Sequence, residues 1–170
     1  MDDLGRGSEH RGDRERERAL QLGYRAVGRR ERTVAELRTL LERKRVEPEA
    51  IDDAVIELTD AGFLDDARYA QRFAEDKREL ERWGSERIAR ELQRRGIAPD
   101  VIEATVADRS REAELETALL LLAQRVPSPG DDRERDRAWR LLVRRGYETE
   151  LAYEAVRRHE GGSGDERRAA

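Results

Sequence analysis

One sequence pattern occurs three times along the 170-residue chain, and this repetition constrains the fold more than any other feature. Segments beginning at Glu36, Arg87 and Arg137 align without gaps, at offsets of 51 and 50 residues. Apolar residues coincide in all three copies, as at Leu41/Leu92/Leu142, Val46/Ile97/Tyr147 and Val55/Val106/Val156. Helices rich in Leu, Arg and Glu resemble one another by composition alone, but matching turns at nearly equal offsets argue against that alternative.

The shared pattern describes two helices joined by a turn. The first helix ends at a basic pair, and Gly96 or Gly146 supplies a left-handed C-cap after it. A Pro or Thr then begins the next helix, at Pro48, Pro99 and Thr149. A further helical pattern precedes each pair, over residues 18–28, 66–80 and 111–125. Because no stretch alternates as a strand does, we predict an all-α fold of three tandem three-helix repeats that form an elongated, curved array.

The predicted repeats occupy residues 18–64, 65–109 and 110–159. The flanking segments, residues 1–17 and 160–170, are polar and of mixed charge. Such segments cannot bury enough apolar surface to offset the entropy that ordering costs. We therefore expect both flanking segments to be disordered.

Several classes of site are excluded by composition. Cysteine is absent, and the two histidines, His10 and His159, lie near the chain ends, so a disulfide framework, a thiolate zinc site or a His-based triad is not expected. No apolar run approaches the roughly 20 residues that span a bilayer, and the start of the chain resembles no targeting signal. We expect a cytoplasmic monomer that has no cofactor, no catalytic residue and no contact with membranes.

The most distinctive local motif lies between the first and second repeats. Its residues are Gly62, Phe63, Leu64, Asp65, Asp66, Arg68 and Tyr69. Two adjacent carboxylates suggest acid–base or metal chemistry, but they follow a Gly-terminated helix and precede an amphipathic one. That position favours an N-cap role, and we expect the aromatic and aliphatic members, with Phe73, to pack one repeat on the next. We interpret the motif as mainly structural, with direct contact to a partner as the alternative.

The motif and its surroundings resemble the RecX family of RecA regulators. The likeness includes Trp83-Gly84, Glu91-Leu92 and Arg95-Gly96-Ile97 in the second repeat, and is weaker in the third. Two features depart from the family pattern: Arg45 replaces the glycine of the other copies, and the chain carries 39 acidic against 35 basic residues. The acidic balance argues against strong binding to DNA alone.

The resemblance implies a function as well as a fold. It implies a regulator that binds the RecA–single-stranded-DNA filament, meets the DNA mainly through RecA, and mainly inhibits RecA ATPase, strand exchange and coprotease activity. It implies no catalytic residue or cofactor. The alternative is an autonomous nucleic-acid-binding module, because three-helix units resemble helix-turn-helix arrangements.

Basic pairs recur at equivalent positions, where the second helix of each repeat ends. They are Arg43-Lys44, Arg94-Arg95 and Arg144-Arg145. The helix macrodipole favours cations at these ends, which explains their sign but not why there are two each time. We hypothesise that the pairs, with Arg87, Arg90 and Arg140, form an evenly spaced stripe that contacts the filament. Trp83 and Trp139 are expected to serve packing, with base stacking as the alternative.

Overall fold

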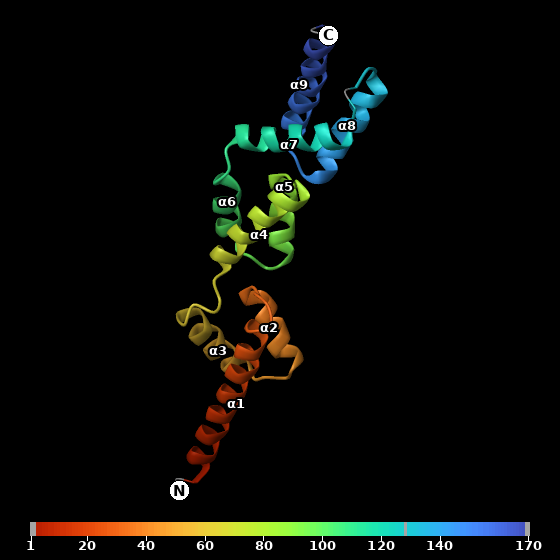
Figure 1. The fold of residues 1–170 in the computed structure, drawn as a ribbon. Helices are drawn as coiled ribbons and strands as arrows, with labels where there is room; N and C mark the ends of the chain where they lie inside the picture. The colour runs from red at the N-terminus through yellow and green to blue at the C-terminus, as the bar shows by residue number, and fades with distance from the viewer. Residues whose placement is uncertain (1–2, 128, 169–170) are drawn as a thin grey trace. The chain divides into compact units, whose positions relative to one another are not determined.

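The computed structural model describes the backbone of residues 3–127 and 129–168 and the side chains of residues 11–127 and 129–161. The described residues form helices and no strand, which confirms the predicted all-α class (Figure 1). The helices are α1 Asp3–Val27, α2 Val34–Arg43, α3 Pro48–Asp60, α4 Asp66–Glu81, α5 Ser85–Arg94, α6 Pro99–Ala107, α7 Arg111–Arg125, α8 Asp132–Arg145 and α9 Thr149–Arg168. No helix in the described part of the chain is both long and apolar enough to cross a lipid bilayer.

The two flanking segments differ from expectation, because both are helical where the structure describes them. Helix α1 begins at Asp3, and α9 continues to Arg168. Charges of opposite sign support α1 at the end of this segment: Arg18 pairs with Glu15 at 3.2 Å, and Arg16 pairs with Glu57 of α3 at 3.4 Å. Residues 1–2 and 169–170 of the segments predicted to be disordered lie outside the described residues.

The chain packs as two compact units, Met1–Ala70 with Arg94–Val101, and Gln71–Gln93 with Ile102–Ala170. The predicted boundaries at residues 64/65 and 109/110 fall in loops between helices, but the units cut across the middle repeat. Three repeats therefore describe the order of helices, whereas two units describe how the chain packs.

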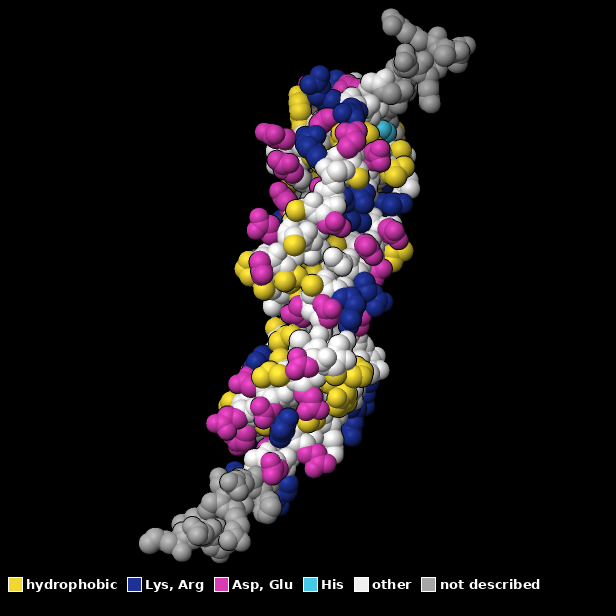
Figure 2. Space-filling view, turned by 90° about the vertical axis from the view of Figure 1, so that its left-hand side faces the viewer, with side chains coloured by type: hydrophobic (Ala, Val, Ile, Leu, Met, Phe, Trp, Pro, Cys, Tyr) yellow, Lys and Arg dark blue, Asp and Glu magenta, His cyan; other side chains and the backbone are white. Residues whose placement is uncertain are grey.

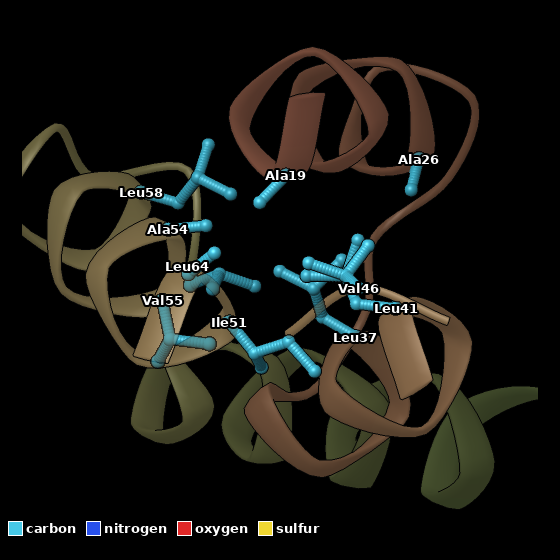
Figure 3. Close-up of a cluster of buried hydrophobic side chains, with 11 residues drawn as sticks. Ala19, Ala26, Leu37, Leu41, Val46, Ile51, Ala54, Val55, Leu58 and Leu64 are labelled. Carbon is cyan, nitrogen blue, oxygen red and sulfur yellow. The ribbon is translucent and has the colours of Figure 1, made fainter. Parts of the chain in front are cut away.

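The core of the first unit lies between α1, α2 and α3. Figure 3 shows Ala19 of α1, Leu37 and Leu41 of α2, and Ile51 and Leu58 of α3 converging on one another. Each of these side chains is at most 3% exposed. Small residues on α1 let the larger side chains of the other two helices approach it closely.

The core of the second unit lies among α7, α8 and α9. Leu115 and Leu122 of α7, Leu142 of α8 and Leu151 of α9 are each at most 1% exposed. Tyr147, in the turn between α8 and α9, is also buried, and its hydroxyl donates a hydrogen bond to the carbonyl of Arg82 at 3.0 Å. Burial raises the pKa of Tyr147, so the hydroxyl stays a donor.

Each second helix ends at a carbonyl that lacks a partner within the helix, and the structure supplies a different donor each time. Arg18 of α1 donates to the carbonyl of Lys44 at 2.9 Å. In the first unit, the Thr33 hydroxyl donates to the carbonyl of Arg95 at 2.7 Å. In the second unit, the Gly84 amide donates to the carbonyl of Arg145 at 2.9 Å. Lys44, Arg95 and Arg145 are equivalent in the repeat alignment.

The second and third of these contacts join one repeat to the next, and we call them the first joint (Thr33–Glu36 with Arg95–Gly96) and the second joint (Gly84–Arg87 with Arg145–Tyr147). Both joints require glycine. Gly96 and Gly146 have φ angles of 78° and 88°. An added Cβ at Gly96 would lie 2.3 Å from the Cβ of Ala35, and one at Gly146 would lie 2.2 Å from that of Arg87.

Arg45, the residue that departs from the glycine pattern, also has a positive φ of 57°. Its side chain is exposed, and the donor to its turn is Arg18 of α1, from the same repeat. The substitution therefore incurs only the left-handed backbone cost, which is about 1–2 kcal/mol. The glycines at the joints are needed for space as well as for backbone conformation.

Alanine substitutions separate these two requirements within the first unit. Gly62 has a φ of 75° with no atom within 4 Å of an added Cβ, whereas Gly96 faces Ala35. G62A should lower the free energy of unfolding by about 1–2 kcal/mol, and G96A by at least about 1 kcal/mol more, because of overpacking. Chemical denaturation followed by circular dichroism measures the difference. Equal losses would show that the first joint is not closely packed.

Candidate basic binding surfaces

The paired aspartates of the motif stabilise two different helices. Asp65 accepts a hydrogen bond from the backbone amide of Arg68 at 2.8 Å and so caps α4. Asp66 accepts one from the backbone amide of Val34 at 2.9 Å, which satisfies an unpaired donor at the start of α2. Burial raises the pKa of Asp66 above its ordinary value, although the hydrogen bond from Val34 opposes the shift.

The remaining members of the motif also serve the fold. Leu64 is 1% exposed and belongs to the core of the first unit. Arg68 donates to the carbonyl of Gly62 at 2.9 Å. Phe63 was expected to pack one repeat on the next, but it is 53% exposed and packs edge-on against Tyr24 of α1 in its own repeat, with ring centroids 5.2 Å apart. The reason is that Leu64, not Phe63, occupies the inward position after the Gly62 turn.

The second member of two of the basic pairs is held inside a joint. Arg95 contacts Glu36 at 3.0 Å and donates to the Tyr69 hydroxyl at 2.8 Å. Arg145 donates to the carbonyl of Glu81 at 2.6 Å. The backbone amide of Glu36 donates to the Thr33 hydroxyl oxygen, which caps α2. The Glu36 side chain faces Arg95 and Arg30 instead, and the Arg30 guanidinium lies 2.9 Å away.

The first member of each pair, by contrast, is exposed: Arg43, Arg94 and Arg144. The later repeats carry two bases at this position because the two have different roles, which we call the division of labour: one base faces the joint and the other faces outward. In the first repeat, where no joint forms on the turn, Lys44 is exposed as well.

A basic groove of about 610 Å³ lies in the first unit, and we call it the joint groove. It brings together the basic pairs of two successive repeats. Its lining residues are Arg30, Arg32, Ala35, Glu36, Thr39, Leu40, Arg43, Lys44, Arg94 and Arg95. Glu36 is the single acid among them, and its charge is already opposed by Arg30 and Arg95.

The cations of the joint groove differ in how they are held. No described residue forms an ion pair or hydrogen bond with the side chains of Arg43 or Lys44. Arg32 donates to the carbonyl of Ala26 at 3.3 Å. Because Arg43 and Lys44 have no acidic partner among the described side chains, they are the cations of the groove most available to an anionic ligand.

A second basic surface lies on α8 in the second unit, and we call it the α8 ridge. Arg133, Arg137, Arg140 and Arg144 line a hollow of about 350 Å³ together with Asp136. Their spacing of four, three and four residues places them on one face of the helix. Asp136 is the single acid of this lining, and it pairs with Arg140 at 2.9 Å, so the four arginines leave the hollow with a net positive charge.

Like Arg140, two further predicted contact residues have partners within the protein. Arg90 pairs with Glu86 at 3.5 Å, and Arg87 lies over the Trp83 ring at 4.0 Å and donates to the Arg144 carbonyl. Arg30, Arg32, Arg133 and Arg137 were missed from the sequence. The regular spacing of Arg133 and Arg137 on α8 could have revealed them, whereas Arg30 and Arg32 have no such signal. An evenly spaced stripe along the chain stays a prediction.

The basic surfaces depend on local clustering and not on net charge. Figure 2 shows acidic and basic side chains interspersed over the described surface of one face. Within the described residues, no group of three or more His, Cys, Asp or Glu side chains could hold a metal ion. The arrangement therefore suits recognition of an anion by arginine and lysine side chains.

Two models of protein families match the chain. The model of the first three-helix domain of RecX matches residues 19–58, and that of the second three-helix domain matches residues 65–106. The regulatory protein RecX of Deinococcus radiodurans is 36% identical over 146 residues, covering 85% of this chain and 70% of the relative. That of Trichlorobacter lovleyi is 35% identical over 127 residues, covering 72% of this chain and 82% of the relative.

Solved structures share the fold. The crystal structure of RecX from Lactobacillus salivarius matches with a TM-score of 0.80 at 15% identity, covering 87% of this chain and 98% of that chain. A crystal structure of a regulatory protein RecX matches with a TM-score of 0.78 at 18% identity, covering 92% of this chain and 78% of that chain.

Glutamine substitutions should separate the joint-facing base from the outward-facing one. R95Q should lower the free energy of unfolding by about 1–3 kcal/mol, because Glu36 and Tyr69 lose a charged partner in a partly buried site. K44Q should change it by no more than about 0.5 kcal/mol, because the Lys44 side chain is exposed. Urea denaturation of both variants checks this, and similar losses in the two would contradict the division of labour.

The raised pKa of Asp66 predicts a pH-dependent effect of D66N. The folded chain holds this proton to a higher pH than the unfolded chain, whose carboxyl has the ordinary value of 3.8. Ionisation of Asp66 therefore reduces stability as the pH rises from that value through the folded pKa. The Asn oxygen still accepts from Val34 but does not titrate. The stability of D66N relative to wild type should thus increase with pH in this window, and a constant difference would contradict the raised pKa.

Proposed function

The chain belongs to the RecX family, and from this premise we propose that it binds the RecA–single-stranded-DNA filament and mainly inhibits RecA. The activities that it restrains are ATP hydrolysis, strand exchange and the coprotease function. It acts by binding, as a regulator without a catalytic step. Family membership is the observation that carries this proposal.

The joint groove supports the proposed mode of binding. It combines the outward-facing cations of two repeats, Arg43, Lys44 and Arg94, on one surface. A filament displays phosphates and acidic side chains at regular intervals. Cations that recur from repeat to repeat can pair with these anionic groups without contacts to particular bases. The lining contains no aromatic residue, so this groove contacts charge and does not stack bases.

A second candidate function is an autonomous nucleic-acid-binding module. The α8 ridge favours it, because four arginines on one helix face resemble a phosphate-contacting surface. A sequence pI of about 5.5 opposes it. Anisotropy titrations with naked DNA at physiological salt distinguish the two, since tight binding with no gain from RecA would favour the autonomous module.

Titration of the chain into RecA-dependent ATP hydrolysis on single-stranded DNA tests the leading proposal. We expect wild type to inhibit. The R43Q/K44Q variant should need an about tenfold or more higher concentration for the same inhibition, because two contacts to phosphates that contribute salt-dependent binding energy are lost. The matched control is R11Q/R25Q, which removes two exposed charges from α1 outside the joint groove. No inhibition at saturation would contradict the proposed function, whereas equal inhibition by both double variants would contradict only the role of the groove.

A further inference from the structure

An aromatic pocket of about 350 Å³ opens between α8 and α9 in the second unit. Trp139 of α8 and Tyr153 of α9 supply its aromatic surface, and Tyr153 is 62% exposed. The full lining is Arg135, Asp136, Trp139, Tyr153, Val156, Arg157 and Glu160. Trp139 packs partly against the core of the unit, and the exposed Tyr153 beside it adds flat apolar surface that faces outward.

The other tryptophan has no such opening. Trp83 is 9% exposed, and its ring lies under the guanidinium of Arg87 at 4.0 Å and the ammonium of Lys77 at 4.8 Å. Phe73 packs on its edge, with ring centroids 6.3 Å apart. The structure thus separates two residues that looked alike in sequence, because one is enclosed by the protein and the other lines a pocket.

The acids of the aromatic pocket are offset within the protein. Arg135 pairs with Glu160 at 2.6 Å and also with Asp132, and Arg140 pairs with Asp136. Arg157 forms no ion pair or hydrogen bond with a side chain that the structure describes. The pocket therefore combines aromatic surface with a cation that has no direct partner among the described side chains.

The aromatic pocket adjoins the α8 ridge. Asp136 lines both hollows, so the ridge and the pocket are two sides of one helix that meet at this residue. The ridge arginines would follow a phosphate backbone over several nucleotides, and Arg157 would contact the phosphate nearest the pocket. Cations along a backbone track with aromatic rings beside them are the elements by which proteins bind single-stranded nucleic acid.

We propose that the pocket lined by Trp139 and Tyr153 receives an unstacked base of single-stranded DNA whose phosphates lie on the α8 ridge. A base paired in a duplex presents no free face, so the site selects single strands. An acidic peptide would use the same cations, but it would gain less from two aromatic rings. Naming single-stranded DNA as the ligand rests on the proposed function, since that is the nucleic acid a RecA filament holds.

The test compares two strands of equal length and charge, a short oligo(dT) and its abasic analogue, with the full chain and without RecA. At low salt, wild type should bind oligo(dT) about tenfold or more tightly than the abasic strand, which corresponds to one stacked base. Salt dependence should be similar for both strands, because the phosphate contacts are the same. Oligo(dT), but not the abasic strand, should quench tryptophan fluorescence, and W139F should abolish that quenching while Trp83 continues to emit.

Y153A should remove most of the preference for oligo(dT), whereas Y24A, which removes an exposed tyrosine from α1, should retain it. Equal affinity for the two strands, unchanged fluorescence, or no binding to either strand at low salt would each overturn the proposal. So would Y153A losing RecA inhibition while keeping its preference for oligo(dT), since the pocket would then bind protein. Because RecA is absent from the binding assay, the proposed function can fail in the ATPase titration while base stacking holds.

Discussion

The carbonyl that ends each second helix needs a hydrogen-bond donor, and the source of that donor determines how the repeats connect. A buried carbonyl without a partner costs about as much as a lost hydrogen bond. Arg18, Thr33 and Gly84 supply the three donors from preceding elements. In the later two cases the donor belongs to the start of a second helix one repeat earlier. Capping one helix and joining two repeats are therefore a single interaction.

This arrangement also determines where the bases lie. The chain approaches so closely at Gly96 and Gly146 that a Cβ cannot be accommodated, and the adjacent Arg95 and Arg145 are drawn into the joint. Their neighbours Arg94 and Arg144 stay exposed. In the first unit the outward-facing bases of two repeats consequently meet in the joint groove. The packing of the repeats thus explains how a slightly acidic chain carries a local basic surface.

Features encoded by neighbouring residues could be predicted from the sequence, and features that depend on distant ones could not. The helix–turn–helix pattern and the Asp65 cap each depend on residues three or four apart. The contact between Asp66 and Val34 spans 32 residues and has no local signal. Composition alone predicts disorder for residues 1–17, whereas the structure describes helix from Asp3, because composition does not show ion pairs such as that between Arg18 and Glu15. The two tryptophans differ only in their tertiary surroundings.

Lysine footprinting tests most directly whether the joint groove contacts the filament. The chain contains two lysines, Lys44 in the groove and Lys77, which pairs with Glu81 and lies over Trp83. Acetylation rates measured by mass spectrometry, for the free chain and for the chain saturated with RecA–single-stranded-DNA filament, report on both at once. The account predicts that filament slows acetylation of Lys44 several-fold and leaves that of Lys77 unchanged. Equal reactivity of Lys44 in the free and filament-bound chain would contradict it.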